Sequence, residues 1–207
     1  MLSLQHRFLF VHIPKTGGNS IQKALEPYSE DQFTANQPFQ DGKERFGIQN
    51  PHFAYHKHST LQEYKQLIPE DRYTPLTKFT AVRNPWDRMI SLYFSPHAGR
   101  AEFDSKTFER IVKEAQSISD YTTSPSWFGK ITRKNPLQTS EIQHFLRFER
   151  LQEDFESLCK VLEIPSIQLQ KLNASQKSDY RMYYDSDLKK LVHEKFKNEI
   201  DFFGYQF

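Results

Sequence analysis

The stretch Phe8-Leu-Phe-Val-His-Ile-Pro-Lys-Thr-Gly-Gly-Asn-Ser20 decides the fold that this sequence predicts. Its first six residues are β-formers and all apolar except His12, so we expect a strand with both faces buried over Phe8–Ile13. A loop that contains two adjacent glycines follows at Pro14–Gly18. Ile21, Ala24 and Leu25 then fall on one face of an expected helix. The chain therefore opens with a strand, a glycine-containing loop and a helix.

The rest of the chain repeats this alternation. Leu76–Val82 and Ile142–Phe148 predict two further strands, and each is followed by a helical pattern. Asn84 is the expected N-cap of the first of these helices, with Pro85 as its first residue and an end near Phe94. Four other helices are expected. One begins at Thr60 and ends before Pro69, and a second spans Phe108–Ile118. A third follows the third strand over Leu151–Leu162, and a fourth extends from an N-cap at Ser186 to Ile200. Residues 29–58 show no clean period and predict a long irregular segment.

Strands that alternate with helices predict an α/β fold around a mostly parallel sheet. The length of 207 residues fits a single domain over residues 1–207. Ligands of such sheets bind at the carboxyl ends of the strands. The loops at 14–18 and 83–85 both lie at such ends.

Composition narrows the classes of partner. Lys plus Arg is 28 and Asp plus Glu is 26, so the formal net charge is +2. That balance argues against binding nucleic acid and leaves room for one local anion pocket. The single cysteine, Cys159, allows no internal disulfide. No apolar stretch is long enough for a membrane segment. The oligomeric state cannot be deduced from the sequence.

The loop Lys15-Thr-Gly-Gly-Asn-Ser20 has the chemistry of an anion site. A helix N-terminus presents unpaired N–H groups, glycines allow close backbone approach, and a lysine adds a charge. Thr16, Asn19 and Ser20 add side-chain donors. The Walker A order places its lysine after the last glycine, whereas Lys15 precedes both glycines here. This difference argues against a kinase or ATPase.

A second anion site is expected where the second strand meets its helix, in Arg83-Asn-Pro-Trp-Asp-Arg-Met-Ile-Ser91. Arg83 can grip a phosphate with its planar fork. Ser91 shares a helix face with Arg88. Asp87 is expected to cap the helix and to pair with Arg88. Trp86 and the aromatic stripe that follows it are expected in the core.

Together the two segments resemble those of sulfotransferases. The first is similar to their 5′-phosphosulfate loop, and the second to their 3′-phosphate motif R-x-P-x-x-R-x-x-S. Phe148-Glu-Arg-Leu151, Leu172-Asn-Ala-Ser175 and Phe203-Gly-Tyr-Gln-Phe207 resemble the carbohydrate, glycosaminoglycan-type branch. The resemblance is weak over 27–55 and 95–140.

The resemblance implies a P-loop-like three-layer fold and the donor 3′-phosphoadenosine-5′-phosphosulfate (PAPS), with 3′,5′-ADP as product. It implies that the 5′ side of PAPS is held by Lys15, Thr16, Gly17, Gly18, Asn19 and Ser20. Arg83 and Ser91 would hold the 3′-phosphate, and Lys177 would close over the donor. Lys15 would also be catalytic. The transferred group carries less charge than a phosphoryl group, so no metal is expected to be required.

The segment Tyr55-His-Lys-His58 supplies candidates for the base. A neutral histidine can take a proton from the acceptor hydroxyl near pH 7. In the resembled branch a histidine of this region is the base, so His56 and His58 are the candidates. In an extended segment they would face opposite ways, and we prefer His58 because it adjoins the next helix. Two alternatives remain open: solvated loop histidines, or a zinc site that includes His52.

Other choices also remain open. His12 could orient a loop group or could be an ordinary strand histidine. Glu149 and Asp154 could be catalytic, but a solvated helix start explains them better. The acceptor is expected to be a hydroxyl compound bound by the aromatic-rich segments 29–55 and 95–135. By resemblance it is a saccharide, and a phenol, a lipid alcohol or a small metabolite remains open. A P-loop-like nucleotide-dependent kinase and a non-catalytic nucleotide-binding module are the alternative functions. Because the Golgi relatives carry a membrane anchor and this chain shows none, we expect either a cytoplasmic enzyme or a shortened piece of a membrane-anchored protein.

Overall fold

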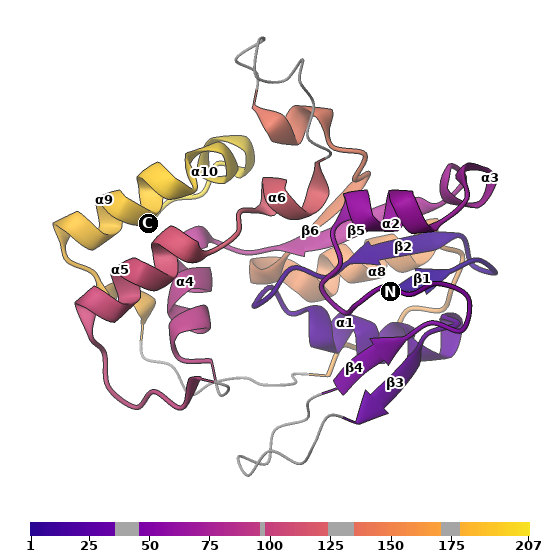
Figure 1. Ribbon diagram of the computed structural model, residues 1–207, viewed down its shortest axis with the longest axis horizontal. Coiled ribbons are helices and arrows are strands. Elements are labelled where there is room, and N and C mark those ends of the chain that lie inside the picture. The colour runs from indigo at the N-terminus through magenta and orange to yellow at the C-terminus, as the bar shows by residue number, and fades with distance from the viewer. Residues whose placement is uncertain (36–45, 96–97, 124–134, 171–178) are drawn as a thin grey trace. The chain divides into compact units, whose positions relative to one another are not determined.

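A computed structural model describes residues 1–35, 46–95, 98–123, 135–170 and 179–207 (Figure 1). The chain divides into two compact units. Unit 1 comprises Met1–Val82 with Glu141–Ala174, and unit 2 comprises Arg83–Ser140 with Ser175–Phe207. No helix among the described residues is long and apolar enough to cross a membrane.

Unit 1 is built on a four-stranded sheet of order β1-β2-β5-β6. Its strands are β1 (Leu2–Ser3), β2 (Phe8–Val11), β5 (Thr77–Val82) and β6 (His144–Arg147). β2, β5 and β6 are parallel, and β1 is an antiparallel edge strand. The three predicted strands are thus confirmed, with shorter bounds, as is the α/β fold with a mostly parallel sheet and flanking helices.

The helices of unit 1 follow the strands as expected. They are α1 (Gly18–Leu25), η1 (Glu26–Tyr28), α2 (Leu61–Leu67), α3 (Glu70–Tyr73), η4 (Phe148–Arg150) and α8 (Leu151–Val161). The predicted capping box of α2 is present, because Thr60 accepts from the N–H of Glu63 while the Glu63 side chain accepts from the N–H of Thr60. In Figure 1, α1 and α2 flank β2 from opposite sides.

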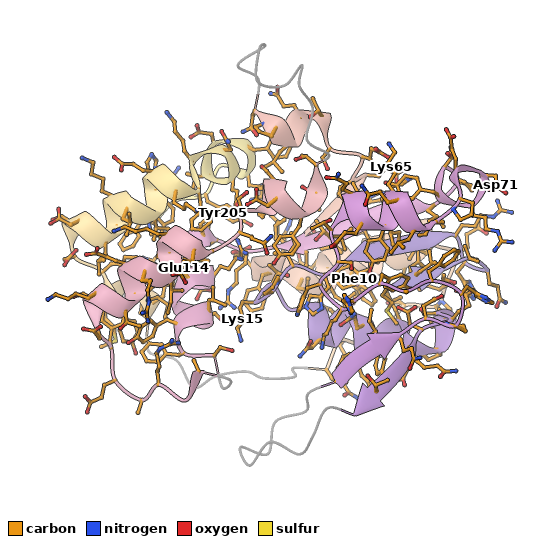
Figure 2. All side chains as sticks on the ribbon, viewed as in Figure 1. Phe10, Lys15, Lys65, Asp71, Glu114 and Tyr205 are labelled. Carbon is orange, nitrogen blue, oxygen red and sulfur yellow. The ribbon has the colours of Figure 1, made fainter. Side chains whose placement is uncertain are left out.

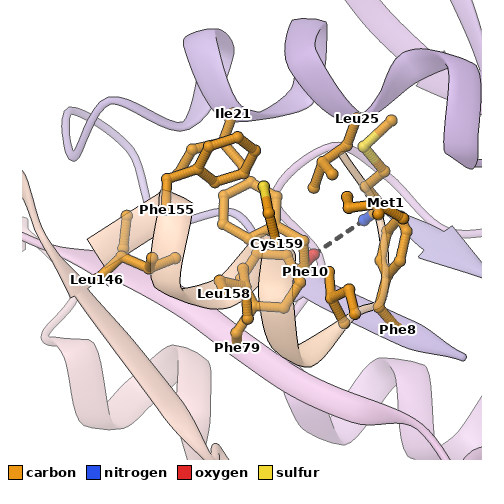
Figure 3. Packing of buried hydrophobic residues seen from close by; sticks show 13 residues of the cluster. Met1, Phe8, Phe10, Ile21, Leu25, Phe79, Leu146, Phe155, Leu158 and Cys159 are labelled. Atoms are coloured by element: carbon orange, nitrogen blue, oxygen red, sulfur yellow. Dashed lines mark hydrogen bonds between the residues drawn. The ribbon is translucent and has the colours of Figure 1, made fainter. Parts of the chain in front are cut away.

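One face of the sheet forms the main core with α1 and α8. Figure 3 shows Phe10 and Phe79 packed against Ile21 of α1 and against Phe155 and Leu158 of α8. All five side chains are at most 2% exposed. Burying rings and branched chains of this size stabilises a fold by about 1.5–3 kcal/mol per side chain. This core fixes α1, and hence the loop that precedes it, at the carboxyl end of β2.

The expectation of an irregular segment over residues 29–58 is wrong in part. Gln32–Ala35 (β3) and Phe46–Gln49 (β4) pair as an antiparallel hairpin. The Phe33 and Phe46 rings stack with centroids 4.2 Å apart. Such cross-strand aromatic pairs stabilise short hairpins.

Unit 2 is helical among its described residues. It contains α4 (Pro85–Tyr93), α5 (Ser105–Glu114), α6 (Ile118–Thr122), η3 (Pro136–Thr139), η5 (Tyr180–Tyr183), α9 (Ser186–Lys195) and α10 (Lys197–Phe203). α4 packs against α5, α9 and η5, and buries Trp86, Met89, Ile90 and Tyr93 as expected.

Two helix predictions in unit 2 are corrected. The helix expected over Phe108–Ile118 is interrupted at Ala115, because Ser117 and Asp120 form a capping box that starts α6. The expected C-terminal helix is divided at Phe196 into α9 and α10. Its cap is Asp185, whose carboxylate accepts from the N–H of Leu188, and not Ser186.

Candidate active site

The loop between β2 and α1 presents backbone N–H groups. α1 begins at Gly17, which is in the left-handed conformation with φ 90° and has no side chain to cap the helix. By contrast, side chains cap α2, α4 and α5. The first N–H groups of an α-helix have no partner within the helix, and no side chain of Gly17 caps those of α1. That this loop binds an anion stays a prediction.

Lys15, labelled in Figure 2, has an unusual backbone conformation. Its φ is 70°, one of three positive values among the described non-glycine residues. A residue with a Cβ pays about 1–2 kcal/mol for the left-handed region. Strain of this kind collects at functional sites, where the surrounding structure maintains it. The Lys15 side chain is only partly buried.

The two glycines are required by the packing of the protein itself. A Cβ at Gly17 would lie 2.7 Å from Cδ2 of Leu151 and 3.2 Å from Cδ2 of Phe148. A Cβ at Gly18 would lie 2.1 Å from Cδ2 of His12. The loop is thus wedged between the start of α8 on one side and an imidazole ring on the other. This packing is a second reason for glycine at these positions, besides the close approach of an anion that we predicted from the sequence.

The side-chain donors predicted for the loop are not equivalent. The Thr16 hydroxyl is fully buried and donates to the main-chain oxygen of Ile13 at 2.8 Å. Its hydroxyl proton therefore closes the turn. Asn19 is partly exposed and Ser20 is 8% exposed. Asn19 is the better placed of these side chains to donate to a ligand.

In unit 2, the start of α4 holds the second predicted motif. The side chain of Asn84 accepts from the N–H of Trp86, which confirms Asn84 as the N-cap. Arg83 follows Val82, the last residue of β5. Its Nε and Nη2 atoms lie 2.8 and 2.7 Å from Oδ2 of Asp87. The expected pairing of Asp87 with Arg88 is therefore corrected, because Asp87 pairs with Arg83.

Arg88 points into unit 2. It is 3% exposed, its Nη2 donates to the main-chain oxygen of Gln116 at 2.9 Å, and its Nη1 lies 4.0 Å from Oε2 of Glu199. Burial raises the pKa of Glu199 to about 7, although Arg88 opposes this rise. Arg88 thus links α4 to α10, while Ser91, three residues on, is 8% exposed.

The two candidate histidines lie in a turn of unit 1. The main-chain N–H of Ser59 donates to the oxygen of His56, and the N–H of His56 donates to Oγ of Ser59, both at 3.0 Å. The assumption of an extended segment is therefore wrong. Lys57 and His58 occupy the middle of the turn, and Nζ of Lys57 donates to the oxygen of Phe46 at 2.8 Å, which ties the turn to β4.

His58 is oriented by the end of β2. Its Nδ1 atom lies 3.0 Å from the main-chain oxygen of His12. A carbonyl oxygen can only accept, so Nδ1 carries the proton and the neutral ring has its lone pair on Nε2. This hydrogen bond joins the turn to His12, which lies three residues before Lys15. The structure brings His58 and the loop between β2 and α1 together in unit 1, and among the described residues it shows no such bond for the His56 ring.

A zinc site is not supported here. Among the residues that the structure describes, no three His, Cys, Asp or Glu side chains are grouped to hold a metal ion, and this includes His52, His56 and His58. Asp154 accepts from the N–H of Arg147 and pairs with Arg150, so it braces the start of α8, although α8 has no side-chain cap. Lys177 lies outside the described residues.

The partner of Asp87 was predicted wrongly, although its i,i+4 spacing from Arg83 is a signal for the pair that forms. Gln22 was not singled out from the sequence at all. Gln22 is fully buried in α1 beside His12. No local pattern distinguishes Gln22 from a surface glutamine, because its burial depends on tertiary packing.

These features define an α/β protein with a glycine-containing loop at the carboxyl end of a parallel strand and a histidine beside it. The comparisons with known proteins extend this description. The chain matches the sulfotransferase family over residues 1–206 and belongs to it. No curated protein and no solved structure matches the chain.

The protein is therefore a transferase that uses PAPS as its donor. The described residues fit this donor. α1 begins without a side-chain cap, and the N–H groups of its first turn and the ammonium of Lys15 suit the charge of a phosphosulfate. When bound, PAPS supplies the sulfuryl group that is transferred.

Proposed function

We propose that this sulfotransferase acts on a hydroxyl group of a saccharide, with His58 as the general base. The observation that carries the role of His58 is its bond to the main-chain oxygen of His12. This bond leaves the lone pair on Nε2, the atom that would take the proton of the acceptor hydroxyl. His58 is an exposed residue, so an acceptor could reach it from solvent.

Lys15 is proposed to stabilise negative charge on the phosphate oxygen that the sulfuryl group leaves. A charge that develops in the transition state is stabilised most by a donor that is already in position. The left-handed backbone at Lys15 supports this role, since the strain is otherwise unexplained. Thr16, Gly17, Gly18, Asn19 and Ser20 are proposed to hold the 5′ side of PAPS.

Arg83 and Ser91 are proposed to bind the 3′-phosphate, in keeping with the resemblance of their motif. The pair that Arg83 makes with Asp87 supports this role, because an oriented guanidinium loses little freedom on binding phosphate. Lys177 is proposed to close over the donor. Since the family match runs through both units, we also propose that residues 1–207 form one sulfotransferase domain.

The saccharide is supported by the branch that the motifs resemble and by part of the aromatic content. In the segment 29–55, Phe46 and Tyr55 are buried and serve the hydrophobic core of unit 1. Phe33 and Phe53 remain partly exposed. Of these two, Phe53 lies in the chain segment that leads to His58 and is the better candidate to stack on a sugar ring.

The acceptor is tested by transfer of isotopic sulfate from PAPS to a panel of compounds. The panel holds unsulfated glycosaminoglycan-type saccharides, a phenol, a lipid alcohol and small hydroxyl metabolites. We expect label in a saccharide, with one 3′,5′-ADP released per sulfate transferred. Label in the phenol or the lipid alcohol and none in any saccharide would overturn the saccharide assignment and leave the sulfotransferase activity standing.

A further inference from the structure

The ring of His12 touches two parts of the proposed site within unit 1. His12 follows the last residue of β2 and is 3% exposed. Its ring centroid lies 4.5 Å from that of His58, with the planes at 55°. The same ring fills the space beside Gly18, where a Cβ would come within 2.1 Å of it. His12 is therefore a wedge between the turn that carries the base and the start of α1.

The polar atoms of His12 are arranged in a way that packing alone does not require. Among the described residues, Nδ1 of His12 is buried without a hydrogen-bond partner, and so are Oε1 and Nε2 of Gln22. Gln22 lies close enough to act on the pKa of His12, which it raises. Two adjacent buried side chains with complementary donors and acceptors need only a small rotation to pair. An ordinary strand histidine would have its ring nitrogens satisfied.

Burial and three charged neighbours of His12 favour its neutral form. Burial is the largest cause and lowers the pKa of His12 well below its ordinary value. Positive charge on His58, Lys57 and the amino group of Met1 lowers it further. A neutral His12 does not compete with His58 for a proton, and it adds no second positive charge beside a base that has just been protonated.

We propose that His12 is a positioning residue for His58, in which the main-chain oxygen selects the tautomer of the base and the ring fixes its orientation. The inference rests on the proposed role of His58 as base. It assigns His12 no proton transfer, because the carbonyl oxygen that meets Nδ1 cannot pass a proton on.

The test is a double-mutant cycle on the full chain. We expect His12→Ala to lower kcat about 10- to 100-fold, as a small misplacement of a catalytic group does, with the Kd for 3′,5′-ADP within about twofold of the wild type. In a His58→Ala background the same substitution should change kcat by less than about twofold, because it acts through His58. Equal losses in the two backgrounds would overturn the proposal. His6→Ala, which removes another histidine of unit 1, is the matched control.

Two further measurements separate positioning from folding. ¹⁵N NMR of the neutral His58 ring should show the proton on Nδ1 in the wild type and a mixture of tautomers in His12→Ala. His12→Phe, which keeps a ring in place, should preserve more of that tautomer than His12→Ala and more of the activity. An unchanged tautomer in His12→Ala would overturn the role of the ring. If His58 were not the general base, the result would be distinguishable, because the His58→Ala variant would itself remain active.

Discussion

Arg83 is clamped by Asp87, with two of its guanidinium nitrogens 2.8 and 2.7 Å from one carboxylate oxygen. The Arg83 side chain is 11% exposed, so the pair is well shielded from solvent. A pair of this kind fixes the plane of the guanidinium before any phosphate arrives. The start of α4 therefore presents an arginine whose orientation is already set.

Replacement of Arg83 should weaken the binding of 3′,5′-ADP much more than that of 5′-AMP. Loss of one charge-assisted contact costs roughly 1.5–3 kcal/mol. In Arg83→Ala we expect this loss for 3′,5′-ADP alone, measured by isothermal titration calorimetry. Asp87→Asn keeps the shape of the partner and should give a smaller loss for the same nucleotide. Equal losses for the two nucleotides would refute the 3′-phosphate assignment.

Replacement of Lys15 should affect kcat, the affinity for 3′,5′-ADP and the stability of the fold to different extents. Lys15→Ala is expected to lower kcat strongly while 3′,5′-ADP still binds, because the charge that it meets develops mainly in the transition state. Lys65→Ala, on the exposed side of α2, serves as the control and should keep its turnover.

The backbone at Lys15 adds a second measurement to this prediction. Because its φ is 70°, Lys15→Gly should be at least as stable as Lys15→Ala and up to about 1 kcal/mol more stable, by urea unfolding. Near-normal turnover in either variant would end the catalytic role of Lys15. If Lys15→Gly were less stable than Lys15→Ala, the claim that the Lys15 backbone is strained would be contradicted.

Gly18 and His12 should be coupled through the space that they share. Gly18→Ala forces a Cβ into the His12 ring and should reduce the free energy of unfolding by about 1–3 kcal/mol. In a His12→Ala background the ring is gone, so the same change should cost much less. Chemical denaturation of the two single variants and the double variant gives the coupling energy. Strict additivity would show that the ring does not fill this space.

Glu199 predicts a pH dependence of stability in unit 2. Its pKa of about 7 lies above the unfolded value of about 4.3, so the native state binds more protons between these values. Its contribution to stability is therefore lost as the pH rises through 7, by about 2–3 kcal/mol between pH 5 and pH 8. Relative to the wild type, Glu199→Gln should gain that amount over the same range, measured by urea unfolding at several pH values. Glu194→Gln, on the exposed surface of α9, should show no such trend, and a constant difference for Glu199→Gln would refute the raised pKa.

Much of the fold could be predicted because its signals are local. The caps at Thr60 and Asn84 and the apolar run before Pro14 each depend on neighbours in sequence. The hairpin of β3 and β4 could not be predicted, because its strands are four residues long and lie in a polar segment. The break after α5 was missed because Ile118 continues the apolar period into the next helix.

In the candidate site, too, the local motifs could be predicted from the sequence and the long-range contacts could not. The loop Lys15–Ser20 and the motif from Arg83 to Ser91 are read directly from sequence, because each sits on one strand-to-helix junction. The partners that orient these residues come from elsewhere. Glu199 meets Arg88 from 111 positions away, and the oxygen of His12 meets His58 from 46 positions away. Such pairs follow from tertiary packing, which a single sequence without an alignment does not reveal.

The most direct test of the account is the rate of sulfuryl transfer from PAPS by His58→Ala, with 3′,5′-ADP affinity measured on the same preparation. We predict a fall in kcat of roughly 10²–10⁴-fold with the affinity nearly intact, a smaller effect of His56→Ala, and no loss of wild-type activity in EDTA. Reversed severity of the two variants would move the base to His56. Wild-type turnover in His58→Ala, or loss of activity in EDTA that zinc restores, would contradict the account.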